Sequence, residues 1–323
     1  MSKPLVDWAL LVVPGTIWGA SFLFIAEGLE AVAPNGVTFT RIAIGFLTLS
    51  LFPSARTPVA RADWAGTAAL GVLWLAFPLS MFPFAEQHVS SALTGMLNGA
   101  TPLFVAAVAS LIARQLPERG VVFGLIVGFG GAVIMALPAM GGPSSAFGIG
   151  LIVAALVSYG IALNIARPLQ QRNGAIPVVW RALGVALILT APLGLPEVVK
   201  GEWTLRPALA LLALGAGGTA IATILAATAA GRMGATTASA TAFLIPVVAL
   251  ILGILVRHER VEIVSLIGAG ICLIGAAIIR NPSMFARIKS ATESRSHGET
   301  KQVARFATAG LWAAARRTDH REK

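Results

Sequence analysis

The sequence is a succession of apolar segments, each close to the length of a bilayer-crossing helix. A hydrocarbon core about 30 Å thick requires roughly 20 helical residues. Short polar or Gly/Pro-containing breaks separate ten such runs, at residues 8–26, 37–52, 64–85, 89–113, 120–137, 147–166, 175–195, 207–231, 233–256 and 263–279. We therefore predict an all-α membrane protein with ten transmembrane helices.

Composition supports lipid as the solvent of this chain. Hydrophobic residues make up 56% of the sequence and charged residues 12%, whereas soluble domains carry about 25% charged residues. A chain this apolar cannot cover its surface with polar groups. Because Pro14 interrupts the first run and nine further runs follow it, we interpret that run as a retained helix and not a cleaved signal peptide.

The residue types that hold metals or perform catalysis are scarce. The single cysteine, Cys272, lies in an apolar run, so no disulfide is expected. The four histidines, His88, His258, His297 and His320, show no metal-ligand spacing. No His, Asp or Glu lies deep in an apolar run, so we predict no metal, no cofactor and no enzymatic activity.

The net charge of +10 could indicate nucleic-acid binding, but its placement argues against such a partner. The segment 281–323 holds nine Lys/Arg against four Asp/Glu, and most other basic residues sit in short loops between apolar runs. This distribution is typical of a membrane topology signal. We predict that 281–323 is a basic, largely disordered cytoplasmic tail, in which residues 303–311 either rest on anionic lipid or are simply solvated.

Loop charges also predict the orientation in the membrane. With a cytoplasmic N-terminus, the inner loops carry Lys3, Arg56, Arg61, Arg114, Arg119, Arg167, Arg172 and Arg232, and the outer loops carry Lys200, Arg206, Arg257 and Arg260. This excess of inner positive charge predicts cytoplasmic N- and C-termini. We expect a multi-pass protein of a bacterial inner membrane.

The chain also contains an internal repeat. A shift of 144 residues pairs Pro102 with Pro246, Glu118 with Glu262 and Gly124 with Gly268, and a slightly smaller shift pairs Trp18-Gly19 with Tyr159-Gly160 and Arg41 with Arg181. Each half, 1–138 and 147–280, contains five predicted helices. Since five is odd, the halves must be inverted relative to one another, a plan common among secondary transporters.

These residues resemble a known family. The first copy has Trp18-Gly19, Arg41, a tight turn at 85–92 and Pro102, and the second has Tyr159-Gly160, Arg181, Pro246 and His258-Glu259-Arg260. Over residues 8–280 this order resembles two EamA domains of the drug/metabolite transporter superfamily. The resemblance implies solute transport by alternating access, with amino acids and other metabolites among the substrates. Two departures are Gln115, where the family usually has Glu, and Glu86, where an apolar residue is common.

Arg41 and Arg181 are the charged residues that lie clearly within predicted spans. Intramembrane charges are costly and therefore mark candidate functional sites. Both arginines could line a cavity and attract a substrate carboxylate or phosphate. Alternatively, each could cap helix carbonyls or extend to the lipid headgroups, because both lie within about two turns of a helix start.

Glu27 and Glu86 stand at the outer ends of the first and third runs. A buried carboxylate there would be the natural proton-coupling group, whereas a carboxylate in contact with water would have no such role. No Asp or Glu lies in the middle of a run, which disfavours the mechanism of small multidrug exporters.

Neutral polar and aromatic side chains complete the candidate substrate site. The predicted substrate-binding residues are Trp18, Arg41, Trp74, Phe77, Asn98, Tyr159, Asn164, Arg181, Ser239 and Thr241, with Thr219 and Thr223 as further polar candidates. Polar side chains of this kind also join helices, and the aromatic ones could instead face lipid. Pro102 and Pro246 remove a backbone hydrogen bond in matched helices, so we predict that they kink these helices near the midplane, where they act in gating.

The sequence therefore predicts a secondary transporter of a small organic solute, an amino acid or related metabolite, with export as the expected direction. The alternative is an exporter or flippase of amphiphilic drugs or lipid-linked compounds. Gly120, Gly124 and Gly128 form a GxxxGxxxG pattern that allows close helix contact. This pattern fits packing within a monomer or the seam of a homodimer.

Overall fold

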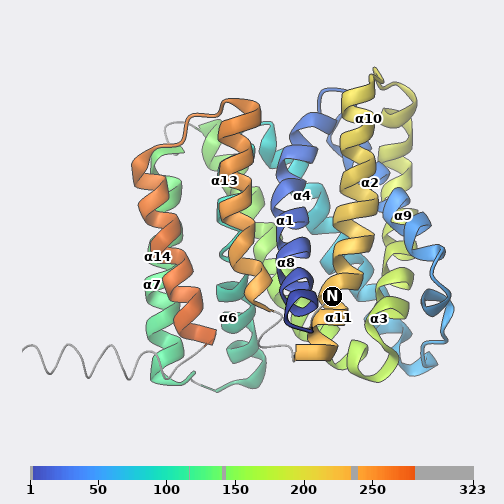
Figure 1. Ribbon diagram of the computed structural model, residues 1–323, viewed down its shortest axis with the longest axis horizontal. Coiled ribbons are helices and arrows are strands. Elements are labelled where there is room, and N and C mark those ends of the chain that lie inside the picture. Colours follow the sequence, from blue (N-terminus) through green and yellow to red (C-terminus); the bar gives the residue numbers. More distant parts are fainter. Residues whose placement is uncertain (1–2, 116, 140–142, 234–238, 281–323) are drawn as a thin grey trace, which may run out of the picture.

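The computed structural model describes residues 3–115, 117–139, 143–233 and 239–280. Within these ranges the chain is built of helices joined by short turns and contains no β-strand, as the apolar runs predict. The helices run up and down in a single bundle (Figure 1). The predicted tail at 281–323 lies outside the described residues.

The helices follow the order of the predicted runs. The first half contains α1 (Lys3–Gly28), α2 (Pro34–Ser50), α3 (Trp64–Leu70), α4 (Phe77–Glu86), α5 (Ser91–Asn98), α6 (Thr101–Ala113) and α7 (Arg119–Ala136). The second contains α8 (Pro143–Asn173), α9 (Ala175–Val199), α10 (Leu205–Leu212), α11 (Ala222–Met233), α13 (Leu244–Arg257) and α14 (Ile263–Arg280). Short 3-10 turns occur at Pro53–Arg56, Arg61–Asp63, Leu137–Ala139 and Ser239–Phe243.

Seven helices of the described chain are long and apolar enough to cross a membrane. Two shorter apolar helices, Thr241–Arg257 and Ile263–Ile279, accompany them. The remaining predicted run coincides with α2, which has 17 residues. The expectation of an all-α membrane protein is therefore confirmed, while length and composition alone do not establish ten crossings.

Helices at matched positions of the two halves pack against each other. α7 lies along α14, and α2 lies along α9. The α7–α14 seam is close because glycines face it: a Cβ atom at Gly131 would collide with the backbone nitrogen of Cys272, and one at Gly275 with the backbone of Gly128. Within the GxxxGxxxG pattern, a Cβ atom at Gly124 would meet Ile279 of α14 and one at Gly128 would meet Leu103 of α6, so helices of the same chain cover these two positions.

Two clusters of buried side chains form the core. One gathers Phe22, Phe82, Met96 and Ile245 with their neighbours. The other surrounds Ile42, Leu70 and Leu183. Tyr159 packs against both clusters, so α8 runs where they meet, in the middle of the bundle.

The two ends of the bundle are distinct. The turn between α6 and α7 lies at the lower end in Figure 1, and the turn between α13 and α14 lies at the upper end. We call the upper end, where α1 ends and α10 begins, the Glu27 end, and the opposite one the Asp63 end. Arg114 and His258, which stand 144 residues apart, end α6 and α13 with positive φ angles of 51° and 52°.

Candidate functional site

A cavity of about 250 Å³ lies between helices of both halves. Its lining residues are Trp18, Ser21, Phe22, Arg41, Trp74, Leu75, Leu79, Phe82, Asn98, Thr101, Tyr159, Leu163, Val179, Gly218, Thr219, Thr223, Ala242 and Ile245. Arg41 is the one charged residue among these. The α7–α14 pair contributes no residue to this lining, so it buttresses the bundle without forming the cavity wall.

One of the three guanidinium nitrogens of Arg41 is hydrogen-bonded to another residue of the described chain. Its Nε donates a hydrogen bond to Thr219 Oγ1 at 3.0 Å, and the residue is 8% exposed. Thr219 Oγ1 in turn donates to the backbone oxygen of Leu214 at 3.3 Å. Within the described chain no hydrogen bond engages the two terminal nitrogens of Arg41, so a planar pair of donors is available to a ligand in the cavity.

Each half contributes a π-helical stretch to the cavity wall. These stretches span Gly71–Ala76, between α3 and α4, and Ala213–Ile221, between α10 and α11. The first carries Trp74, and the second carries Gly218 and Thr219. The wider turn redirects backbone carbonyls, and the oxygen of Gly218 accepts a hydrogen bond from Trp18 Nε1 at 2.9 Å.

Three aromatic rings bound the cavity toward the Glu27 end. The rings of Phe22 and Phe82 meet edge to face with centroids 5.6 Å apart, and Phe82 lies 5.9 Å from Tyr159. Phe22 and Phe82 are 5% and 2% exposed. This apolar layer separates the cavity from the polar groups beyond it.

The two candidate prolines stand at helix starts and not in helix interiors. Asn98 ends α5, the chain turns at Gly99–Ala100, and Pro102 is the second residue of α6. Pro246 lies in the first turn of α13, after the 3-10 turn Ser239–Phe243. The two interruptions touch, because a Cβ atom at Gly99 would lie 3.1 Å from Pro246 Cγ.

The structure brings some of the predicted substrate-binding residues together and leaves others apart. Trp18, Arg41, Trp74, Asn98 and Tyr159 line the cavity. Phe77 does not line it and is 41% exposed on the outside of the bundle.

The remaining predicted residues hold the scaffold together. Asn164 Nδ2 donates to the backbone oxygens of Val105 and Gly160, which ties α8 to α6. Thr241 Oγ1 donates to the backbone oxygen of Leu11. The side chain of Ser239 lies outside the described residues.

Arg181 is placed unlike Arg41. Its Nη1 donates to the backbone oxygens of Ala55 at 3.3 Å and Pro177 at 3.2 Å. Its guanidinium lies over the rings of Trp64 and Trp180, 5.9 and 5.4 Å from their centroids. Arg181 therefore caps helix carbonyls near the Asp63 end, the alternative that its sequence position left open.

Sequence reasoning did not single out several lining residues, among them Ser21, Phe22, Leu79, Phe82 and Thr101. The glycine-rich segment 215–218, which belongs to the second π-helical stretch, is the sequence feature that could have indicated this part of the cavity wall. Its counterpart, Gly71, begins the first stretch and lies 144 residues before Gly215.

Ion pairs tie α1 to α10 and α13 at the Glu27 end. Glu27 is 4% exposed and lies 2.5 Å from Arg206 Nε and 3.2 Å from Arg257 Nη1. Arg257 Nη1 also lies 2.5 Å from Glu30. Glu27 is therefore a buried, paired carboxylate and not the surface carboxylate in contact with water that the sequence allowed.

Two further carboxylates at this end bind helix N-termini. Glu259 accepts hydrogen bonds from the backbone nitrogen and hydroxyl of Ser91, at 3.0 and 2.7 Å, and from the nitrogen of Ala92 at 2.8 Å. Glu197 accepts from Asn35 Nδ2 at 2.8 Å and from the nitrogen of Gly36 at 2.6 Å. Each carboxylate satisfies donors in the first turn of a helix from the other half.

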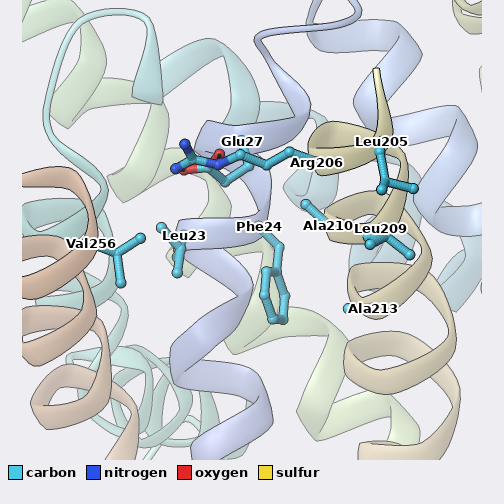
Figure 2. A pocket seen from close by; sticks show the side chains of 9 residues that line it. All are labelled: Leu23, Phe24, Glu27, Leu205, Arg206, Leu209, Ala210, Ala213 and Val256. Atoms are coloured by element: carbon cyan, nitrogen blue, oxygen red, sulfur yellow. Dashed lines mark hydrogen bonds and ion pairs between the residues drawn. The ribbon is translucent and has the colours of Figure 1, made fainter. Parts of the chain in front are cut away.

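A second hollow of about 580 Å³ lies on the outer face of the bundle, between α1, α10 and α13. Figure 2 shows Phe24 between α1 and α10, below the paired side chains of Glu27 and Arg206. Apart from this pair its lining is apolar. We call it the lateral groove.

Within the described chain no group of three or more His, Cys, Asp or Glu side chains is arranged to hold a metal ion. The cavity offers instead a cation, hydroxyls, an amide and aromatic faces, which suit recognition of a small organic anion or zwitterion.

Comparisons with known proteins match both halves of the chain to one family. Residues 8–137 and 146–281 each match the model of the EamA-like transporter family. An uncharacterized transporter of Archaeoglobus fulgidus is 22% identical, covering 84% of this chain and 98% of its own length. A probable terminal-alkyne amino-acid exporter of Streptantibioticus cattleyicolor is 24% identical, covering 89% and 97%. A solved crystal structure shares the fold with a TM-score of 0.57 at 18% identity, covering 88% of this chain and 99% of that one.

Proposed function

The chain belongs to the EamA-like transporter family, and from this premise we propose that it is a secondary transporter of a small organic solute, an amino acid or related metabolite. The cavity between the two halves is the proposed substrate site, and the protein exposes it alternately to each side of the membrane. Export is the proposed direction. The names of the relatives indicate a transporter and not an enzyme.

The proposed architecture is ten transmembrane helices in two inverted repeats, at 1–138 and 147–280. Matched helices pack together, α7 on α14 and α2 on α9, as a two-fold relation between halves requires. The α6–α7 and α13–α14 turns, which occupy matched positions, lie at opposite ends of the bundle (Figure 1). Both observations support the inverted repeat.

The main support for an amino acid as the substrate is the position of Arg41 in the cavity wall. A buried guanidinium with free terminal nitrogens binds a carboxylate through two parallel hydrogen bonds. Asn98 and Tyr159 supply further polar contacts, and Trp18, Trp74 and Phe82 supply apolar surface for a side chain. An α-amino acid fits this combination, and the amino-acid exporter among the relatives supports the choice.

We infer that the conformation is closed at the Glu27 end. Phe22, Phe82 and Tyr159 pack together in the cavity wall, and the Glu27–Arg206–Arg257 ion pairs join α1, α10 and α13 at that end. Alternating access requires this barrier to separate while the Asp63 end closes. With both termini in the cytoplasm, as the loop charges predict, the Glu27 end faces away from the cytoplasm.

The proposal is tested by counterflow into proteoliposomes loaded with unlabelled amino acid. We expect labelled L-alanine, L-leucine or L-phenylalanine to accumulate transiently with the wild-type protein and not with Arg41→Gln. The matched control is Arg181→Gln, which retains the wild-type cavity. Absence of counterflow for a panel of neutral and acidic amino acids would contradict the proposal.

The lateral groove favours a second candidate, transport of amphiphilic drugs or lipid-linked compounds. It is apolar and lies on the outer face of the bundle, with exposed leucines Leu205 and Leu209 at its edge. Ligand-induced shifts in melting temperature distinguish the candidates. Stabilisation by amphiphiles and not by amino acids favours the second.

A further inference from the structure

Glu86, the last residue of α4, is half-buried as a residue, and its carboxylate group is enclosed. Both of its carboxylate oxygens are enclosed, and neither has a hydrogen-bond partner in the described part of the chain. Glu27, Glu197 and Glu259, which stand at the same end, all have donors. Glu86 differs from each of them, because no donor among the described residues contacts its carboxylate oxygens.

The position of Glu86 relates it to the cavity. Phe82 precedes it by four residues, so both lie on one face of α4. Phe82 belongs to the aromatic layer that bounds the cavity. Glu86 therefore lies one turn beyond that layer, inside the barrier that closes the Glu27 end.

The charges that act on Glu86 come from α2, from α13 and from the turn after α13. They are Glu259, Arg257 and Arg41. Arg257 binds Glu27 and Glu30, and Arg41 binds Thr219 and faces the cavity. Glu259 accepts hydrogen bonds from three donors, and its charge disfavours a second negative charge nearby.

The other elements that pack on α4 offer no cation to Glu86. On α8 the titratable group at this layer is Tyr159, whose ring centroid lies 5.9 Å from that of Phe82. On α1 it is Glu27, which Arg206 and Arg257 already engage. Arg257 and Arg41, the two cations that act on Glu86, are bonded to other groups. An ionised carboxylate that is enclosed without a hydrogen-bond donor is strongly unfavourable, whereas the neutral acid is not.

We propose that Glu86 is the proton-binding site of the transport cycle: it holds a proton while the Glu27 end is closed and releases it to water when that end opens. The inference rests on the proposed carrier function. In the release step the carboxylic acid of Glu86 becomes a carboxylate, and one proton passes to the solvent. Opening hydrates the carboxylate, so a high proton concentration favours the closed state and a low one favours the open state.

Accessibility of a cysteine in the barrier tests the proposal without any solute. Ile25 is 1% exposed and belongs to the same buried cluster as Phe82 and Ala85. In a Cys272→Ser background, Ile25→Cys is alkylated by a maleimide in detergent across a pH series. The same cysteine with Glu86→Gln is the reference, because the ionisation of the thiol is common to both proteins and cancels in their ratio.

With Glu86 present, we expect the alkylation rate relative to the reference to rise toward alkaline pH, on the order of tenfold per pH unit at the steepest point. With Glu86→Gln, which imitates the neutral acid, the barrier stays closed at every pH. The matched control is Glu118→Gln, since Glu118 is an exposed carboxylate before α7. It keeps the wild-type pH dependence.

Identical pH dependence with and without Glu86 overturns the proposal, as does an alkylation rate that follows sodium concentration at fixed pH. If Glu86→Gln does not fold, Glu86→Leu replaces it, since it also removes the charge. Because the assay uses no solute, it separates the two proposals. A carrier that moves no amino acid can still show this pH dependence, and an amino-acid carrier can lack it.

Discussion

Arg41 and Arg181 occupy matched positions in the two halves of the chain, yet their surroundings differ. Arg41 lies in the cavity wall, bonded through Nε to Thr219. Arg181 donates to two backbone oxygens and lies over Trp64 and Trp180, away from the cavity. Both halves line the cavity, but its guanidinium comes from the first half alone, so residues at matched positions of the repeat need not share a role.

The largest expected effect is the loss of the Arg41 guanidinium. We expect Arg41→Gln to weaken binding of a carboxylate solute roughly 100-fold, about 3 kcal/mol, because a charge-assisted pair of hydrogen bonds is lost. Arg181→Gln should change affinity less than about threefold. Isothermal titration with L-phenylalanine measures both, and equal losses for the two variants would remove the asymmetry inferred here.

A second effect separates the scaffold from the site. Gly131 faces α14, where a Cβ atom collides with backbone, whereas a Cβ atom at the adjacent Gly130 meets nothing within 4 Å. We expect Gly131→Ala to cost about 1–3 kcal/mol through overpacking. Gly130→Ala should be neutral or gain up to about 1 kcal/mol of helix propensity.

Melting in detergent, followed by circular dichroism, checks this pair of variants. A lower melting temperature for Gly131→Ala alone supports the close seam between α7 and α14. Equal melting temperatures would mean that the two helices are not in the contact described.

The smallest expected effect concerns the turns that end matched helices. Glu259 caps α5 with its carboxylate, whereas Gln115, at the matched position, has an exposed side chain. We expect Glu259→Gln to destabilise the protein by about 1 kcal/mol, because a negative charge at a helix N-terminus is lost. Gln115→Ala should change stability by less than about 0.5 kcal/mol. Thermal melting again decides, and a larger loss for Gln115→Ala would reverse the comparison.

The helices could be predicted from the sequence because apolar runs of this length leave few alternatives. Pro102 and Pro246 also correctly marked interruptions at matched places, although each begins a helix where a kink within one was expected. A helix satisfies its own backbone hydrogen bonds, and a proline removes one of them. The helices and their interruptions therefore depend on nearby residues and can be predicted from one sequence.

The faces that line the cavity could not be predicted in the same way. A transmembrane helix is apolar all round, so periodicity does not reveal which side meets another helix. Phe77 and Trp74 illustrate this, since the π-helical stretch Gly71–Ala76 changes the register between them. One of these side chains lies in the cavity wall and the other on the outer surface.

The environment of the carboxylates depended on distant parts of the chain. Glu27 is buried by Arg206 and Arg257, both more than 170 residues away. Glu86 is affected by Glu259, at a comparable separation. Their positions in the sequence place both carboxylates at helix ends. Whether those carboxylates are buried depends on how the two halves pack together.

In the proposed architecture, the two halves cross the membrane with opposite polarity and enclose the cavity at their junction. Single cysteines at Arg114 and Arg260, in a Cys272→Ser background, test it by labelling of intact cells with an impermeant maleimide. We expect Arg260→Cys to be labelled from outside the cell and Arg114→Cys to be labelled only after the membrane is permeabilised. Labelling of both cysteines from the same side would contradict the inverted architecture, and the proposed carrier mechanism with it.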